Sequence, residues 1–135
     1  MSNIAVVYWS GTGHTEAMAR AVAQGASVPC MTAAEFDPSA IGQYDAIAFG
    51  CPSMGVEQLE DSEFEPMFDA CKDALSGKKI ALFGSYGWGD GEWMRVWQSD
   101  CEALGAVLAA EPVICQDEPD GDALEACRKL GEVLR

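Results

Sequence analysis

The stretch 3-NIAVVYWSGTGHTEAM-18 joins a run of apolar residues to a glycine-rich loop and the start of an amphipathic segment. An apolar run without alternation is typical of a strand buried on both faces, as in a parallel sheet. The helical pattern begins at about residue 14, so the stretch predicts the first strand–loop–helix unit of an α/β protein. The loop holds two glycines and three hydroxyl residues, which are Gly11, Gly13, Ser10, Thr12 and Thr15.

The same unit recurs along the chain. Strands are expected at 3–9, 28–31, 45–50, 79–84 and about 106–115. Helices are expected at about 14–25, 63–76, 92–104 and 121–134. Ser62 and Glu65 have the spacing of a capping box at the start of the second helix. Alternation of strands and helices predicts a parallel sheet with helices on both faces.

Two prolines indicate the order of the strands. Pro29 lies in the second expected strand and Pro112 in the fifth. Because proline cannot donate a ladder hydrogen bond, these strands belong at the edges of the sheet. The sequence therefore predicts one domain over residues 1–135, with a doubly wound five-stranded parallel sheet in the order 2-1-3-4-5. In that order a ligand binds at the carboxyl ends of strands 1 and 3, where the loop after residue 9 lies.

The charge of the chain restricts its partners. Eight basic and 22 acidic residues give a formal net charge of −14. Such a surface repels nucleic acid and anionic lipid, and it favours proteins with basic docking surfaces. No apolar run is long enough to span a membrane, and the first residues lack the basic start of a signal peptide. We expect a cytoplasmic monomer that binds neither nucleic acid nor membrane.

The cysteines do not form a metal-binding pattern. The six cysteines contain no CxxC pair, and the chain has one histidine, His14. Structural zinc sites and iron–sulfur clusters need closer spacing of their ligands. We expect reduced, mostly structural thiols and no bound metal.

The loop at 10–15 has the composition of a monophosphate site. It lacks the Gly-Lys-Ser/Thr of a P-loop, and Glu16 stands where a dinucleotide-binding loop has its third glycine. Hydroxyls and backbone N–H groups at the start of a helix can still hold a phosphate without a basic side chain. The alternative is an ordinary capped turn, but such a turn needs one hydroxyl rather than three.

Two later loops indicate a flat aromatic ligand. Trp88 lies between Gly87 and Gly89, without neighbours in sequence to pack against, and Met54 precedes Gly55 in the loop after the third strand. A thioether packs well on an aromatic face. A heteroaromatic ring between Met54 and Trp88, with its phosphate at the first loop, would account for all three loops.

The motifs YWSGTG-x-TE, GCPSMG and LFGSYGWGDGEW occur here in one order and spacing. With them the chain resembles the short-chain flavodoxins of anaerobic bacteria from end to end. The resemblance implies a low-potential one-electron carrier with one non-covalent FMN, cycling between oxidised, semiquinone and hydroquinone states. It also implies that the protein substitutes for ferredoxin, shuttles electrons between redox enzymes and is not itself an enzyme.

By resemblance, Met54 covers the inner face of the flavin and Trp88 the outer face, while Gly55 and Glu57 lie at its N5 and N3 edge. The phosphate site implied in the same way consists of Ser10, Gly11, Thr12, Gly13, His14 and Thr15. The other residues implied around the flavin are Ser53, Val56, Ser85, Tyr86, Gly87, Gly89 and Asp117.

Two residues depart from the family pattern. The family commonly has Asn at the position of His14, which leaves open whether this imidazole is charged beside the phosphate or neutral. A smaller or polar residue is often found at the position of Val56. A β-branched residue disfavours the positive φ of a type II turn, so Val56 is expected to favour the flipped turn and to ease the first reduction step. The acidic loops are expected to lower the second potential.

Two other functions fit parts of the pattern. A small FMN-dependent NAD(P)H or quinone reductase would need a second substrate pocket, which Trp88 would obstruct. A phosphate-binding regulator or phosphatase would need a CxxxxxR motif or an acidic cluster after the first strand, and the sequence has neither.

Overall fold

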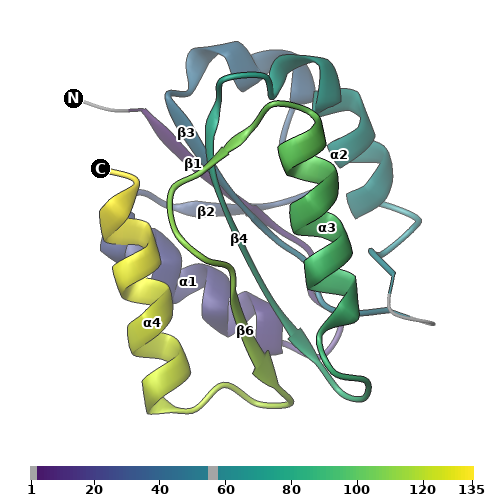
Figure 1. Ribbon diagram of the computed structural model, residues 1–135. Coiled ribbons are helices and arrows are strands. Elements are labelled where there is room, and N and C mark those ends of the chain that lie inside the picture. The colour runs from purple at the N-terminus through teal and green to yellow at the C-terminus, as the bar shows by residue number, and fades with distance from the viewer. Residues whose placement is uncertain (1–2, 55–57) are drawn as a thin grey trace.

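The computed structural model describes residues 3–54 and 58–135. Six parallel strands form one sheet, shown in Figure 1: β1 (Ile4–Tyr8), β2 (Cys30–Thr32), β3 (Ala46–Gly50), β4 (Lys79–Tyr86), β5 (Val107–Leu108) and β6 (Val113–Gln116). The order is β2-β1-β3-β4-β5, and β6 also pairs with β4. The doubly wound order predicted from the two prolines is therefore confirmed.

The fifth expected strand is the one that differs. Residues 106–115 form two short strands, both paired with β4, in place of one continuous strand. Leu108 lies opposite Ile80, and Val113 lies opposite Phe83. The break contains Pro112, which has no N–H to offer to the ladder. The prediction of an edge location was right, and the prediction of continuity was wrong.

Helices cover both faces of the sheet. They are α1 (His14–Ala26), α2 (Phe64–Cys71), α3 (Glu92–Ala103) and α4 (Gly121–Val133), with short 3-10 segments η1 (Pro38–Gln43) and η2 (Lys72–Ala74). The α1 and α4 helices lie side by side on one face, and α2 and α3 lie on the other (Figure 1). Alternate residues of β1 face the two layers, since Val6 packs with α1 and α4 while Val7 packs with α2 and α3.

Two glycines allow the close contact between α1 and α4. A Cβ atom on Gly25 would collide with the backbone carbonyl of Arg128, and one on Gly131 would collide with that of Val22. The two helix backbones therefore touch, so α1 packs closely on α4.

The start of α2 is capped by a different residue from the one the sequence indicated. The buried Glu60 carboxylate accepts the N–H groups of Ser62, Glu63 and Phe64 at 2.8–2.9 Å, and the Ser62 hydroxyl donates to it as well. The Ser62 capping box was therefore wrong, because the Glu65 N–H that the Ser62 hydroxyl would have capped donates to the Glu60 backbone carbonyl at 2.9 Å, and the Ser62 hydroxyl donates to the Glu60 carboxylate. Burial raises the pKa of Glu60, but these hydrogen bonds outweigh it and hold the pKa below the ordinary value.

The cysteines behave as core residues. All six are free thiols, and Cys51, Cys71, Cys101 and Cys127 are buried. Burial raises the pKa of the Cys51, Cys101 and Cys127 thiols to about 12, so they stay protonated at neutral pH. Within the described ranges, no group of three or more His, Cys, Asp and Glu residues could hold a metal ion.

Candidate functional site

A cavity of about 240 Å³ opens where β1, β3 and β4 end at their carboxyl termini. This is the edge at which the strand order reverses, and α/β sheets bind ligands there. The cavity is lined by Trp9, Gly11, Thr12, His14, Pro52, Ser53, Met54, Ser85, Tyr86, Gly87 and Asp117. Four segments that are far apart in sequence thus contribute to one site, at the carboxyl ends of β1, β3, β4 and β6.

The first loop folds its hydroxyls onto its own backbone. The Ser10 hydroxyl accepts the N–H of Gly13 at 3.0 Å, and the Thr12 hydroxyl accepts the N–H of His14 at 3.4 Å. Gly13 precedes α1 with a φ of 95°, a conformation that favours glycine. The first N–H groups of a helix have no partner within it, and they carry the positive end of its dipole. The start of α1 can therefore receive an anion.

Thr15 is placed differently from the other hydroxyls. Its side chain is buried, and its Oγ1 lies 2.9 Å from the Ser85 Oγ at the end of β4. Its hydroxyl also accepts the Ser85 N–H at 3.4 Å. The Thr15 hydroxyl thus joins α1 to β4. Its role as a phosphate ligand stays a prediction.

Apolar and aromatic side chains form the rest of the wall. Met54 forms a bridge with Gln58, through N–H to carbonyl bonds of 2.7 and 2.8 Å in the two directions. Tyr86 packs on Trp93 with ring centroids 5.4 Å apart, and the Trp93 indole donates to the Cys51 carbonyl. These contacts hold the loop that contains Met54 and the end of β4 that contains Tyr86 against the core.

Some predicted site residues lie outside the lining of this cavity. The Trp88 side chain is 62% exposed, and among the described residues Ser10, Gly13, Thr15, Trp88 and Gly89 do not line the cavity. Thr12 and His14 also line a neighbouring hollow of about 410 Å³, to which Gly13 contributes. Three predicted residues, Gly55, Val56 and Glu57, lie outside the described residues.

The sequence did not single out Trp9 and Pro52, which also line the cavity. Trp9 looked like the last residue of the first strand. Its position next to the glycine-rich loop could have indicated that Trp9 belongs to the site, because a bulky ring at the end of a strand packs on the loop that follows.

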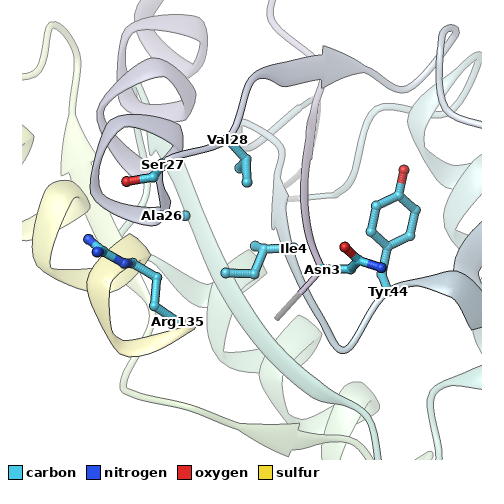
Figure 2. A pocket seen from close by; sticks show the side chains of 7 residues that line it. All are labelled: Asn3, Ile4, Ala26, Ser27, Val28, Tyr44 and Arg135. Carbon is cyan, nitrogen blue, oxygen red and sulfur yellow. The ribbon is translucent and has the colours of Figure 1, made fainter. Parts of the chain in front are cut away.

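A larger hollow of about 610 Å³ lies at the opposite edge of the sheet (Figure 2). It borders Asn3, the first residue that the structure describes, and Arg135, the last residue of the chain. Arg135 donates to the carbonyl of Gly25. This hollow is at the amino end of β1, away from the switch point, and none of the predicted site residues lines it.

The comparisons with known proteins agree with this geometry. Residues 6–131 match the family described as Flavodoxin. Flavodoxins of Clostridium beijerinckii and Megasphaera elsdenii are each 42% identical to the chain over 134 residues, which covers 96% of both proteins compared.

The chain belongs to the flavodoxin family. The solution structure of the two-electron reduced flavodoxin of M. elsdenii matches this flavodoxin with a TM-score of 0.85 over 97% of both chains. An oxidised flavodoxin of Bacillus cereus, 26% identical, matches with a TM-score of 0.85 over 98% of this chain and 97% of that one. Flavodoxins bind a flavin and transfer electrons, and they are not enzymes. No helix in the described part of this flavodoxin is long and apolar enough to cross a membrane.

The residues of this flavodoxin fit a flavin phosphate. The cavity offers an aromatic and thioether wall for a ring, and it adjoins a helix start that can receive an anion. A Cβ on Gly13 would meet nothing within 4 Å, and one on Gly87 would meet only the Asp117 carboxylate, at 3.7 Å. The backbone is therefore open to a ligand at both ends of the site.

One acidic residue lines the described part of this cavity, and others follow Trp88 in the sequence. Asp117 lines it, with a φ of 59° and with its N–H bonded to the Tyr86 carbonyl at 2.8 Å. Arg95 is the base nearest in sequence to the Trp88 loop, and it pairs with Asp90 at 3.0 Å and with Glu92 at 2.7 Å. Since two carboxylates share one guanidinium, this group leaves the loop with an excess of negative charge.

Proposed function

We propose that this flavodoxin holds one non-covalent FMN at the cavity of β1, β3 and β4 and passes single electrons between redox proteins at low potential. The observation that carries the proposal is the juxtaposition of two features. An aromatic-lined cavity lies beside the start of α1, where the Ser10 and Thr12 hydroxyls and the first N–H groups of the helix are gathered. The bound FMN supplies the one-electron chemistry.

The phosphate would be held at residues 10–15. The loop contains no Lys or Arg, so its N–H groups and hydroxyls must supply the binding energy. The Ser10 and Thr12 hydroxyls, which now accept N–H groups of their own loop, would turn to donate to the phosphate. His14 lines the cavity beside them. A proton NMR titration of the imidazole, with and without FMN, distinguishes a charged His14 from a neutral one.

The ring would lie between the loops after β3 and β4. Met54 would pack on its inner face, and Trp88, from the exposed loop beside Gly87, would cover its outer face. Ser53, Ser85, Tyr86, Gly87, Gly89 and Asp117 would surround it, with Gly55, Val56 and Glu57 at its edge. Packing of aromatic and thioether groups on a flat ring excludes water from both faces.

A low second potential follows from the charges around the site. Reduction adds negative charge to the bound FMN, and Asp117 at the cavity wall opposes it. The pairing of Arg95 with two carboxylates leaves little positive charge nearby. High salt should screen these charges and raise the second potential.

The partners would be redox proteins with basic docking surfaces, which a chain of net charge −14 attracts over long range. We propose that the chain acts as a single-domain monomer in these encounters. Electron transfer to such a partner should slow as the ionic strength rises.

Reconstitution tests the proposal. Purified protein is stripped of ligand, titrated with FMN, and then mixed with NADH or NADPH and a quinone. An FMN carrier takes up one FMN per chain and shows a flavin spectrum without oxidising the nicotinamide. Steady nicotinamide oxidation by the purified chain would instead identify a reductase.

A further inference from the structure

Trp9 lines the cavity and contacts both the first loop and the segment before α2. Its backbone N–H donates to the Gly50 carbonyl at 3.0 Å, and its indole N–H donates to the Glu63 carboxylate at 3.3 Å. A Cβ added at Gly11 would lie 3.0 Å from Cη2 and 3.2 Å from Cζ3 of the ring. The backbone of the first loop therefore lies directly on the indole, while the indole N–H holds the segment before α2.

Glu63 is itself held in place. Its N–H donates to the Glu60 carboxylate at 2.8 Å, and Glu60 is only 4% exposed. Glu63 ends the turn that leads into α2, so its position follows from the buried cap of that helix. The Trp9–Glu63 bond thus connects the first loop to a rigid part of the core.

The neighbouring acid does not share this role. Glu16 lines the same small hollow as Trp9 and Glu63. Its carboxylate receives the Tyr8 hydroxyl at 3.3 Å and the Arg20 guanidinium at 2.9 Å. Of these two carboxylates, that of Glu63 accepts the Trp9 indole N–H.

We infer that Trp9 and Glu63 are positioning residues, whose bond fixes the distance between the phosphate loop and the ring pocket. This inference rests on the proposed FMN function. One FMN molecule binds to the phosphate loop and to the ring pocket at once. Its affinity therefore depends on the spacing between these two subsites. Riboflavin, which lacks the phosphate, needs the ring pocket only.

Loss of the Trp9–Glu63 bond should therefore change the affinities for FMN and riboflavin by different factors. In Glu63→Ala the indole N–H has no acceptor, and the first loop gains freedom relative to the segment before α2. We expect FMN to bind about three- to tenfold more weakly, as for the loss of one hydrogen bond worth about 1 kcal/mol. Riboflavin affinity should change by less than about twofold, since the ring pocket itself stays intact.

Three further variants control the experiment. Glu63→Gln keeps an acceptor for the indole and should retain most of the FMN affinity. Trp9→Phe removes the N–H and also changes the wall of the cavity that Trp9 lines, so it should weaken the binding of both flavins, and that of FMN more. Glu65→Ala removes an exposed carboxylate from the first turn of α2 and should leave the ratio of FMN to riboflavin affinity unchanged.

The measurement is fluorescence titration of the ligand-free protein with each flavin, and the Trp9 indole N–H is followed by NMR in the ligand-free state. In Glu63→Ala the indole signal should move upfield, towards that of a free indole. Equal losses of FMN and riboflavin affinity, or no loss of either, would overturn the inference. A wild-type protein that binds riboflavin and FMN equally, or neither, would instead refute the proposed function.

Discussion

The hydroxyl oxygens of Thr15 and Ser85 lie 2.9 Å apart, although 70 residues separate them in the chain. Thr15 is in the first turn of α1, and Ser85 is near the end of β4. Both are buried. The pair ties the helix start that would hold the phosphate to the strand end that borders the ring pocket, so a polar contact inside the core sets part of the site.

Replacing Thr15 should show how much the Thr15–Ser85 contact contributes to the free energy of unfolding. Thr15→Val keeps the shape of the side chain but leaves the buried Ser85 hydroxyl without its partner. We expect a loss of about 1–3 kcal/mol in the free energy of unfolding of the ligand-free protein, measured by urea denaturation. Thr15→Ser keeps the hydroxyl and should lose less. Equal losses in the two variants would mean that the methyl group, rather than the hydroxyl, carries the effect.

The Glu60 cap should make stability depend on pH. Its folded pKa lies below the unfolded value of about 4.3, so its contribution is present above that value and is lost as the pH falls through the folded pKa. Glu60→Gln should reduce the free energy of unfolding by about 1–3 kcal/mol at pH 7.

Urea denaturation of both proteins from pH 7 to pH 3 measures the effect of Glu60. The difference between wild type and Glu60→Gln should shrink at the acid end of this range. A difference that stays constant down to pH 3 would show that the Glu60 charge contributes nothing to the cap.

The strands and their order could be predicted where the residues of the strand itself determine its place in the sheet. The apolar run at residues 4–8 and the prolines 29 and 112 were sufficient for the sheet and its order. The break between β5 and β6 was missed, because the apolar residues on both sides of Pro112 resemble one continuous strand. A proline indicates an edge strand, but it does not say whether the strand resumes beyond it.

The site was less accessible to sequence reasoning. Glycine and hydroxyl residues marked the loop at 10–15, yet the partners of its neighbours are distant in the chain. Trp9 pairs with Glu63, 54 residues on, and Thr15 pairs with Ser85. The Ser62 capping box failed for the same reason, since nothing in its spacing shows that the Glu60 carboxylate is already bound there. Contacts between residues that are far apart in the chain leave no periodic pattern in the sequence.

Asp117 should lower the second potential of the bound flavin. Asp117→Asn removes the charge, and Asn tolerates the φ of 59° at this position. We expect the second potential to rise by roughly 20–40 mV, the effect of one charge about 10 Å away in a polar medium. Asp45→Asn, at the amino end of β3, is the matched control. An equal rise in both variants would assign the effect to net charge alone.

Val56 should affect the first potential. The residue lies outside the described part of the chain, so this prediction comes from its sequence. Val56→Gly removes the penalty on a positive φ and should favour the unflipped turn, which lowers the first potential. Spectroelectrochemical titration measures it. A first potential that is unchanged or higher in the variant would contradict the role given to this side chain.

A redox titration of the protein reconstituted with FMN tests the central claim most directly. The account predicts one FMN per chain and two separate one-electron steps, the second at low potential and higher in strong salt. It also predicts no consumption of NADH or NADPH in the same cuvette. A protein that remains colourless after exposure to FMN, or that oxidises nicotinamide continuously, would contradict the account.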